Sequence, residues 1–279
     1  RVARVGLEQN FITLGLSRDL QVRLSKRKLR GRQVKLQPVE NLMVNVRKIK
    51  DPIEIAAIRR AVACAQDAYA IVRRDLRIGA IENDIAAQLE YEMRRLGAQR
   101  SSFDTNVSAG ANSSKPHYRP GRVPVTADSV LLFDWGAVVD GYCSDITRTH
   151  FVGRAPPKLR EVYRIVLEAQ RAAIGAIRPG TLTGNVDRVA RNLIAKAGFG
   201  KNFGHGLGHG IGLAIHELPR LSRTARPEPL QPGMVVTVEP GIYLPGVGGV
   251  RIEDDVLVTE SGCEVLTSLD QSFEGCNLE

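Results

Sequence analysis

Residues 129–151 read SVLLFDWGAVVDGYCSDITRTHF, two mostly apolar segments joined by Asp140-Gly141. Asp-Gly between two such segments is a strong signal for a two-residue hairpin turn. We therefore expect strands over 129–137 and 142–151, paired antiparallel. Because helical patterns precede and follow this hairpin, the sequence predicts the fold class α+β.

The expected register brings two carboxylates together. A turn at 140 and 141 pairs positions whose numbers sum to 281, so Asp134 lies opposite Thr147. By the same rule Asp145 lies opposite Gly136, on the face that carries Asp134, given no bulge. Two carboxylates this close repel each other unless a proton or a cation intervenes. We favour a divalent metal here over two Asp on a solvent-facing side of the hairpin, because the flanking residues are apolar.

Helix pairs lie on both sides of the hairpin in the sequence. Asp51 is suited to cap a helix that begins at Pro52 and continues at helical spacing to about residue 77. Further helices are expected over about 82–96, from Pro156-Pro157 to about 177, and then to about 197. The chain from residue 200 is glycine-rich and strand-like, with turns expected at Pro232-Gly233 and Pro240-Gly241. Two rounds of a helix pair followed by strands predict a domain with pseudo-repeated halves over 47–279.

The composition excludes several classes of protein. The 279 residues are 43% hydrophobic and 25% charged, as in soluble globular proteins. No apolar run approaches the roughly 20 residues that cross a membrane, and the N-terminus shows no signal-peptide pattern. The cysteines are widely spaced without a CxxC pair, which indicates a reducing compartment and no cysteine-built metal site; they are Cys64, Cys143, Cys263 and Cys276. We expect a cytoplasmic protein.

The net charge of +9 is concentrated near the N-terminus. Residues 1–50 hold 13 Lys/Arg and 3 Asp/Glu, whereas residues 51–279 hold 26 and 27. A basic run could bind nucleic acid or acidic lipid through phosphate contacts; it comprises Lys26, Arg27, Lys28, Arg30, Arg32 and Lys35. No interleaved aromatic residues accompany it. We therefore favour a solvated surface over a nucleic-acid partner.

A glycine-rich segment carries two histidines at positions i and i+4. Residues 204–212 read GHGLGHGIG, and five glycines in nine residues, each costing about 1 kcal/mol in a helix, exclude a helix. In an extended chain His205 and His209 project to one side, and His216 follows shortly after. Three histidines within twelve residues, in a chain that holds five, favour a functional cluster over a structural role.

Two glutamates lie in strand-like segments that otherwise resemble a core. Glu239 ends an apolar strand, and Glu253 lies within residues 250–256, which read VRIEDDV. A buried Glu is rarely left unpaired. Arg251 shares a strand face with Glu253 and could be its ion-pair partner. Alternatively, four carboxylates and a histidine form the donor set of a dinuclear site that suits Mn²⁺, Co²⁺, Fe²⁺ or Zn²⁺.

Together these motifs resemble the Xaa-Pro dipeptidase and aminopeptidase P branch of the pita-bread metallopeptidases. The resemblance spans about 47–279 and is carried by residues 133–137, 141–149, 208–212, 216–219, 238–243 and 250–254. It implies the pita-bread α+β fold, with two similar halves around the metals. Residues 1–46 would be a basic remnant resembling the end of the family's N-terminal domain, because 5–8 look like its final part. A homodimer is also implied.

The resemblance assigns roles to individual residues. It implies five metal ligands, with Asp145 and Glu253 bridging two ions: Asp134, Asp145, His209, Glu239 and Glu253. It places His117 and His216 beside the substrate, and Arg251 where it orients a ligand carboxylate. His205 and Tyr243 are candidates on the substrate side. A metal-bridging hydroxide would attack the N-terminal Xaa-Pro bond of a short peptide or dipeptide, with Glu239 as proton shuttle.

Two alternatives remain open from the sequence. Methionine aminopeptidase resembles the same domain, although residues 251–254 and 217–219 favour the proline branch. A non-catalytic pita-bread binding module is the second alternative, and the complete set of expected ligands argues against it. Manganese is the favoured metal of the two expected ions.

Overall fold

The computed structural model describes residues 2–275 and the backbone of 277–278. The chain divides into two compact units, Arg1–Arg47 and Lys48–Glu279. The sequence places this boundary after residue 46. Cys276 lies outside the described residues, whereas Cys64, Cys143 and Cys263 are free thiols. No helix among the described residues is long and apolar enough to cross a membrane.

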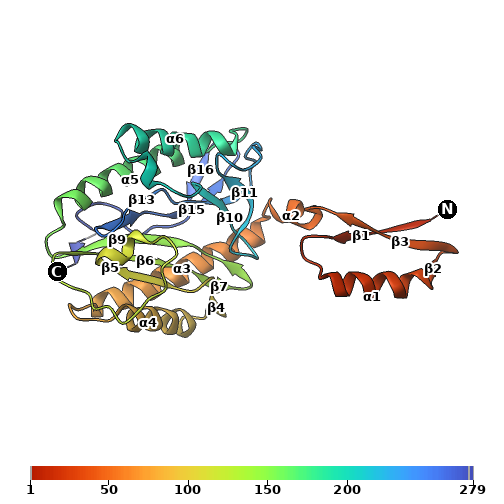
Figure 1. Ribbon diagram of the computed structural model, residues 1–279, viewed down its shortest axis with the longest axis horizontal. Coiled ribbons are helices and arrows are strands. Elements are labelled where there is room, and N and C mark those ends of the chain that lie inside the picture. The colour runs from red at the N-terminus through yellow and green to blue at the C-terminus, as the bar shows by residue number, and fades with distance from the viewer. Residues whose placement is uncertain (1, 276, 279) are drawn as a thin grey trace. The chain divides into compact units, whose positions relative to one another are not determined.

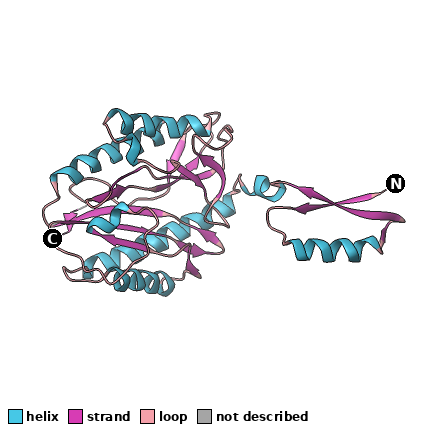
Figure 2. Cartoon of the chain, in the orientation of Figure 1, coloured by secondary structure: helices cyan, strands magenta, loops and turns pink. Residues whose placement is uncertain are grey.

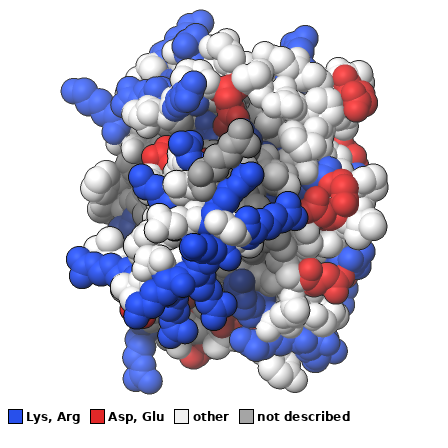
Figure 3. Space-filling view, turned by 90° about the vertical axis from the view of Figure 1, so that its right-hand side faces the viewer, with Lys and Arg blue, Asp and Glu red and all other residues white. Residues whose placement is uncertain are grey.

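The first unit is a small α/β structure with few buried side chains. The strands β1 (Ala3–Glu8), β2 (Lys28–Leu29) and β3 (Arg32–Val39) form a sheet of order β1-β3-β2, in which β1 and β3 are parallel. The helices α1 (Leu14–Ser25) and α2 (Leu42–Arg47) complete it. Within 2–47 only Val34 is buried, so the basic run is solvent-exposed. Figure 3 shows Lys and Arg outnumbering Asp and Glu on the face that it presents.

The second unit begins with a helix pair and the predicted hairpin. Its first half comprises α3 (Pro52–Asp75), α4 (Glu82–Arg95), β4 (Arg100–Ser101), β5 (Asn106–Ala109), the 3-10 helix η1 (Gly110–Ser114), β6 (Ser129–Trp135), β7 (Ala137–Val139), β8 (Tyr142–Cys143) and β9 (Ile146–Val152). The predicted cap of α3 is confirmed. The Asp51 carboxylate accepts from the N–H groups of Ile53 and Glu54, and the Glu54 carboxylate accepts from the Asp51 N–H.

The second half repeats this order with a longer run of strands. It comprises α5 (Pro157–Gly175), α6 (Thr183–Lys196), η2 (Gly200–Asn202), β10 (Gly208–Gly210), β11 (Glu217–Leu221), β12 (Val235–Val238), β13 (Gly241–Leu244), β14 (Gly248–Arg251), β15 (Asp254–Val258), β16 (Cys263–Val265) and β17 (Asn277–Leu278). The larger sheets have the orders β17-β9-β6-β5 and β11-β10-β12-β15-β16, and the smaller ones are β4-β7-β8 and β13-β14. The glycine-rich 204–212 segment contains no helix, as predicted.

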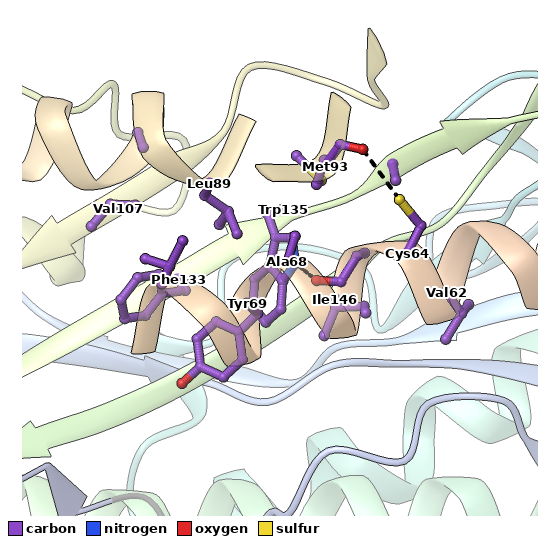
Figure 4. Close-up of a cluster of buried hydrophobic side chains, with 14 of the residues drawn as sticks. Val62, Cys64, Ala68, Tyr69, Leu89, Met93, Val107, Phe133, Trp135 and Ile146 are labelled. Atoms are coloured by element: carbon purple, nitrogen blue, oxygen red, sulfur yellow. Dashed lines mark hydrogen bonds between the residues drawn. The ribbon is translucent and has the colours of Figure 1, made fainter. Parts of the chain in front are cut away.

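Helices cover the strands of this unit on two sides. Figure 1 shows α4 and α6 on opposite outer sides, with the strands between them, and Figure 2 shows the same layers by secondary structure. Two hydrophobic cores lie beneath the helices, each built mainly but not wholly from one half. In the first core (Figure 4), Tyr69 of α3 stacks on Trp135 of β6 with ring centroids 4.7 Å apart, and the Trp135 indole N–H donates to the Ala65 carbonyl. The predicted α+β architecture with two related halves is confirmed.

The hairpin keeps the predicted register but is split between two sheets. Asp134 pairs with Thr147 in β6–β9, and Val138 pairs with Cys143 in β7–β8, as the turn at 140 and 141 requires. The prediction of two continuous strands was wrong at Gly136. A Cβ there would lie 1.9 Å from the Ser144 carbonyl oxygen, so the backbones approach too closely for any other residue.

Two further expectations were wrong for a related reason. Residues 250–256 are not one strand, because β14 pairs with β13 whereas β15 pairs with β12 and β16, and Glu253 lies at the switch between the two sheets. The structure has no turn at Pro240-Gly241, where the chain leaves β12 and enters β13. The turn at Pro232-Gly233 is present.

Candidate metal centre

A cleft of about 850 Å³ in the second unit brings together the residues that the sequence singles out. Its lining includes the five predicted ligands and four of the other predicted site residues: Asp134, Asp145, His209, Glu239, Glu253, His117, His205, His216 and Arg251. Tyr243 is not among the lining residues, but its hydroxyl contacts His205 and Arg251. The polar side chains of both halves therefore converge on one cleft.

Strand ends and sheet switches position the acidic side chains. Asp134 lies near the end of β6, and Asp145 directly precedes β9. Glu239 follows β12, and its N–H donates to the Leu207 carbonyl at 2.8 Å. Glu253 lies between β14 and β15. At Asp145, Glu239 and Glu253 the backbone passes from one sheet to another, so these side chains can point into the cleft rather than into a sheet-covered core.

Two of these carboxylates and one histidine form a compact group of possible metal ligands. Each of Asp145, His209 and Glu253 offers one ligand atom, and these atoms lie within 4.8 Å of one another. His209 Nε2 is 3.6 Å from Asp145 Oδ2 and 3.5 Å from Glu239 Oε1. The backbone N–H of His209 donates to the Thr237 hydroxyl at 3.1 Å, and its ring Nδ1 lies 3.1 Å from the Gly210 carbonyl oxygen. The group therefore has a fixed imidazole among carboxylates.

Arg251 pairs with Asp134 rather than with Glu253. Its Nη2 lies 2.5 Å from Asp134 Oδ2, and its Nη1 donates to the Tyr243 hydroxyl at 2.8 Å. The alternative of an Arg251–Glu253 ion pair is therefore not realised, and the carboxylate that Arg251 holds belongs to another of the five expected ligands. The break in the strand at Ile252 and Glu253 is the reason, because the two side chains no longer share a strand face.

Burial and mutual repulsion dominate the electrostatics of the carboxylates. Burial, and then the neighbouring Glu253 and Asp134 charges, raise the pKa of Asp145 well above its usual value. Burial, and then the neighbouring Glu239 and Asp134 charges, raise the pKa of Glu253 well above its usual value. Burial raises the pKa of Glu239 to about 8, against the lowering effect of Arg251. The group favours an added positive charge, supplied by protons or by cations.

The histidines are held in the neutral form, which is the form that binds a metal. Burial, together with nearby His216, lowers the pKa of His209 to about 3. Burial and the Arg251 charge lower the pKa of His205 to about 4. The His205 ring links to Tyr243, whose hydroxyl lies 2.9 Å from Nε2. A neutral imidazole beside carboxylates is a normal ligand set for a divalent ion.

The donor set fits a pair of divalent metal ions. Glu253 Oε1 is buried without a hydrogen-bond partner in the described part of the chain, whereas its Oε2 accepts from the Thr147 hydroxyl at 2.6 Å. An unpartnered buried carboxylate oxygen beside Asp145 and His209 is costly unless a cation binds it. Four carboxylates and one imidazole supply enough oxygen and nitrogen donors for two such ions.

The last two predicted site histidines, His117 and His216, line the cleft on loops from different halves. His117 belongs to the loop between η1 and β6, and His216 directly precedes β11. The His216 and His209 rings are 4.4 Å apart, edge to face. Burial, followed by the Arg220 and His117 charges, lowers the pKa of His216. Both histidines are exposed to the cleft, where a ligand could accept hydrogen bonds from them.

Sequence reasoning missed several side chains that support this site. The Thr147 hydroxyl donates to Glu253 and accepts from Arg251 Nε at 3.0 Å, so it joins the two. Asp255 Oδ2 accepts from the Asp145 N–H at 3.0 Å. The predicted pairing of Thr147 with Asp134 was the available signal for Thr147, whereas the Asp255 contact spans 110 residues and has no local signature.

The fold has two related halves around a cluster of carboxylates and histidines. This combination defines the class of pita-bread metallopeptidases. The chain belongs to metallopeptidase family M24, whose model matches residues 56–260. The expected pita-bread fold is thus confirmed.

Curated relatives share this region of the chain. "Putative dipeptidase YkvY" of Bacillus subtilis (strain 168) is 45% identical over 228 residues, which cover 82% of this chain and 62% of the relative. "Uncharacterized peptidase YqhT" of the same organism is 40% identical over 266 residues, covering 95% and 73%. The chain thus spans 62% to 66% of the length of the first three curated relatives that it matches.

Solved structures are similar to this chain over nearly its whole length. The Xaa-Pro dipeptidase from Bacillus anthracis has a TM-score of 0.91 and 39% identity, covering 97% of this chain and 74% of that one. The X-Pro aminopeptidase from Thermotoga maritima MSB8 has a TM-score of 0.89 at the same identity and coverage. The prolidase from Pyrococcus furiosus has a TM-score of 0.88 and 37% identity, covering 96% and 77%.

Proposed function

We propose that this chain is a dinuclear-metal-dependent exopeptidase that hydrolyses the N-terminal Xaa-Pro bond of dipeptides or short peptides. The observation that carries the proposal is the convergence of four carboxylates and His209 in one cleft, where one Glu253 oxygen has no hydrogen-bond partner among the described residues. The printed names of its similar structures, an Xaa-Pro dipeptidase, an X-Pro aminopeptidase and a prolidase, support the substrate class.

The proposed ligands are the five that the resemblance implies, with Asp145 and Glu253 shared between two ions. Manganese is the proposed metal, and Co²⁺, Fe²⁺ or Zn²⁺ also suit the donor set. When bound, such ions supply Lewis acidity and a water that is deprotonated near neutral pH, the expected bridging hydroxide. Arg251 holds Asp134 in place through its 2.5 Å ion pair, so this ligand is oriented before a metal binds.

The side chains around the ligands act on the substrate. His117 and His216 line the cleft on loops from different halves, and their N–H groups would donate to the oxygen of the scissile carbonyl as negative charge develops. The pKa of Glu239, raised to about 8, suits a group that accepts and returns a proton near neutral pH. His205 lies 4.0 Å from Glu239 and would face the substrate, whereas Tyr243 would act from that side through its hydrogen bond with the His205 ring.

The test compares peptides of different sequence and length with the purified chain in added Mn²⁺. We expect turnover of Xaa-Pro, Xaa-Pro-Yaa or longer peptides, and the length series separates a dipeptidase from an aminopeptidase. Faster turnover of Met-Ala-Ser would replace the proposal by the methionine aminopeptidase alternative. The Asp145→Ala variant is expected to lose metal uptake in calorimetry together with activity. If the parent chain takes up neither Mn²⁺ nor Co²⁺ and Asp145→Ala changes no activity, a binding module is the better description.

A further inference from the structure

A buried carboxylate lies behind the loop that carries His117. Glu82 is the first residue of α4, and none of its surface is exposed to solvent. It does not line the cleft. Burying a carboxylate without partners costs free energy of folding, so the hydrogen-bond partners of Glu82 indicate its role.

Both oxygens of the Glu82 carboxylate are fully used. Oε1 accepts from the Ala109 N–H at 2.7 Å and from Asn112 Nδ2 at 3.1 Å. Oε2 accepts from the Tyr118 hydroxyl at 2.8 Å and from the Gly121 N–H at 3.1 Å. Only an ionised carboxylate offers this many acceptor sites, and the position at the first turn of α4 favours a negative charge. All four donors belong to one stretch of chain.

That stretch, residues 109–121, begins at the end of β5 and includes His117. Backbone hydrogen bonds also hold its C-terminal end against the start of α4, because the N–H groups of Glu82 and Asn83 donate to the carbonyls of Val123 and Gly121. His117 lies between two anchored neighbours. The Pro116 carbonyl accepts from Arg251 Nη1 at 3.4 Å, and Tyr118 is held by Glu82.

We propose that Glu82 is a positioning residue, which fixes the 109–121 segment from inside the protein and so holds His117 at the cleft. An apolar side chain would fill the same space without a desolvation cost, but it would leave four polar donors of the loop unpaired. The carboxylate therefore fixes the course of the loop rather than merely packing beneath it. The kinetic consequence rests on the proposed peptidase function; the conformational consequence does not.

The test uses Glu82→Gln with Glu92→Gln as its matched control. The glutamine keeps the size of the side chain but presents an NH₂ group to one pair of donors, so at least one loop N–H loses its acceptor. Glu92 lies on the same helix, is 8% exposed, and its carboxylate accepts from Arg95 of α4. The control changes a buried carboxylate of α4 without touching the loop.

Hydrogen exchange measures the conformational part. We expect faster amide exchange confined to 109–121 in Glu82→Gln and unchanged exchange of that segment in Glu92→Gln. Uniformly faster exchange over the second unit, or no change in the segment, would overturn the proposal. If Glu82→Gln does not fold, Tyr118→Phe removes one of the four hydrogen bonds, and the same local increase, smaller in size, is expected. Its absence would count against the proposal equally.

Kinetics measure the functional part through a double-mutant cycle with His117→Ala. Glu82→Gln is expected to lower kcat on an Xaa-Pro peptide about tenfold, because a misplacement of about 1 Å can cost up to 100-fold. In the His117→Ala background the same change is expected to cost less than about twofold. Independent, multiplicative effects would show that Glu82 does not act through His117. If no Xaa-Pro peptide is turned over by the parent chain, the proposed function fails while the exchange experiment still decides the role of Glu82.

Discussion

Single residues of this site do more than one task, and Arg251 is the clearest case. Its guanidinium contacts Asp134, Tyr243 and Thr147, and its side chain is 4% exposed. Three contacts in different directions need the planar fork of a guanidinium, which an ammonium group cannot replace. The sequence offered Glu253 as one possible partner for this arginine, because the expected strand was continuous, whereas the structure pairs it with Asp134.

We expect Arg251→Lys to lower kcat/KM and metal affinity by roughly 10- to 100-fold, because Asp134 and Tyr243 lose their common donor. Isothermal calorimetry with Mn²⁺ and steady-state kinetics measure the two effects. Arg60→Lys is the control, since its ion pair with Asp140 is exposed, with side chains 51% and 61% accessible. Equal effects of the two substitutions would contradict the role given to Arg251.

At the scale of elements, the cleft depends on where strands stop. Asp145, Glu239 and Glu253 all lie in breaks between strands. Gly136 lies in the facing break between β6 and β7, where it allows close approach of the Ser144 carbonyl. The helices contribute to the cores instead, because α3 and α4 pack into the first core and α5 and α6 pack into the second. Their ends were predictable from local signals, whereas the strand breaks were not.

Gly136→Ala is expected to destabilise the protein by about 2 kcal/mol or more, because its Cβ would lie 1.9 Å from the Ser144 carbonyl oxygen. Movement of Ser144 also displaces Asp145, so weaker Mn²⁺ binding should accompany the loss. Denaturant unfolding and calorimetry measure both. Gly262→Ala, where no atom lies within 4 Å of the added Cβ, should leave metal binding unchanged. Unaltered stability of Gly136→Ala would show that the two strands can separate at little cost.

The cap of α3 provides a prediction that concerns stability alone. Asp51→Ala removes the acceptor of two helix N–H groups and is expected to cost about 1 kcal/mol of unfolding free energy. Urea unfolding of the variant measures this change. Asp67→Ala, at an exposed position in the middle of the same helix, is expected to change the free energy by less than about 0.5 kcal/mol. A larger effect at Asp67 than at Asp51 would refute the capping argument.

At the scale of the whole molecule, charge and metal binding are separate properties. The positive charge belongs to residues 1–50, and the basic run is exposed within the first compact unit. The cleft in the second unit instead gathers negative charge, with buried carboxylates whose mutual repulsion opposes folding. Dimer formation stays a prediction, which light scattering of the purified chain can check.

Chelation is expected to lower the melting temperature of the metal-loaded protein and to abolish turnover. The reason is that ions bound only by the folded state stabilise it, by about 2.7 kcal/mol at a free concentration 100 times Kd. Calorimetric melting before and after EDTA, and after Mn²⁺ is restored, measures the effect. In Asp145→Asn, EDTA should change the melting temperature much less. A melting temperature of the parent chain that is indifferent to both reagents would contradict metal binding in the cleft.

The sequence by itself determined the helices and the hairpin register, and it singled out most polar residues of the cleft, with His117 added by the family resemblance. The helices and the register follow from local rules: the Asp51 cap, the period of apolar residues, and the turn at Asp140-Gly141. Only the tertiary structure decided which carboxylate Arg251 holds, where the strands break, and that Glu82 anchors the His117 loop. These depend on contacts between segments as far as 117 residues apart, such as Arg251 with Asp134, whose geometry no local pattern in the sequence encodes.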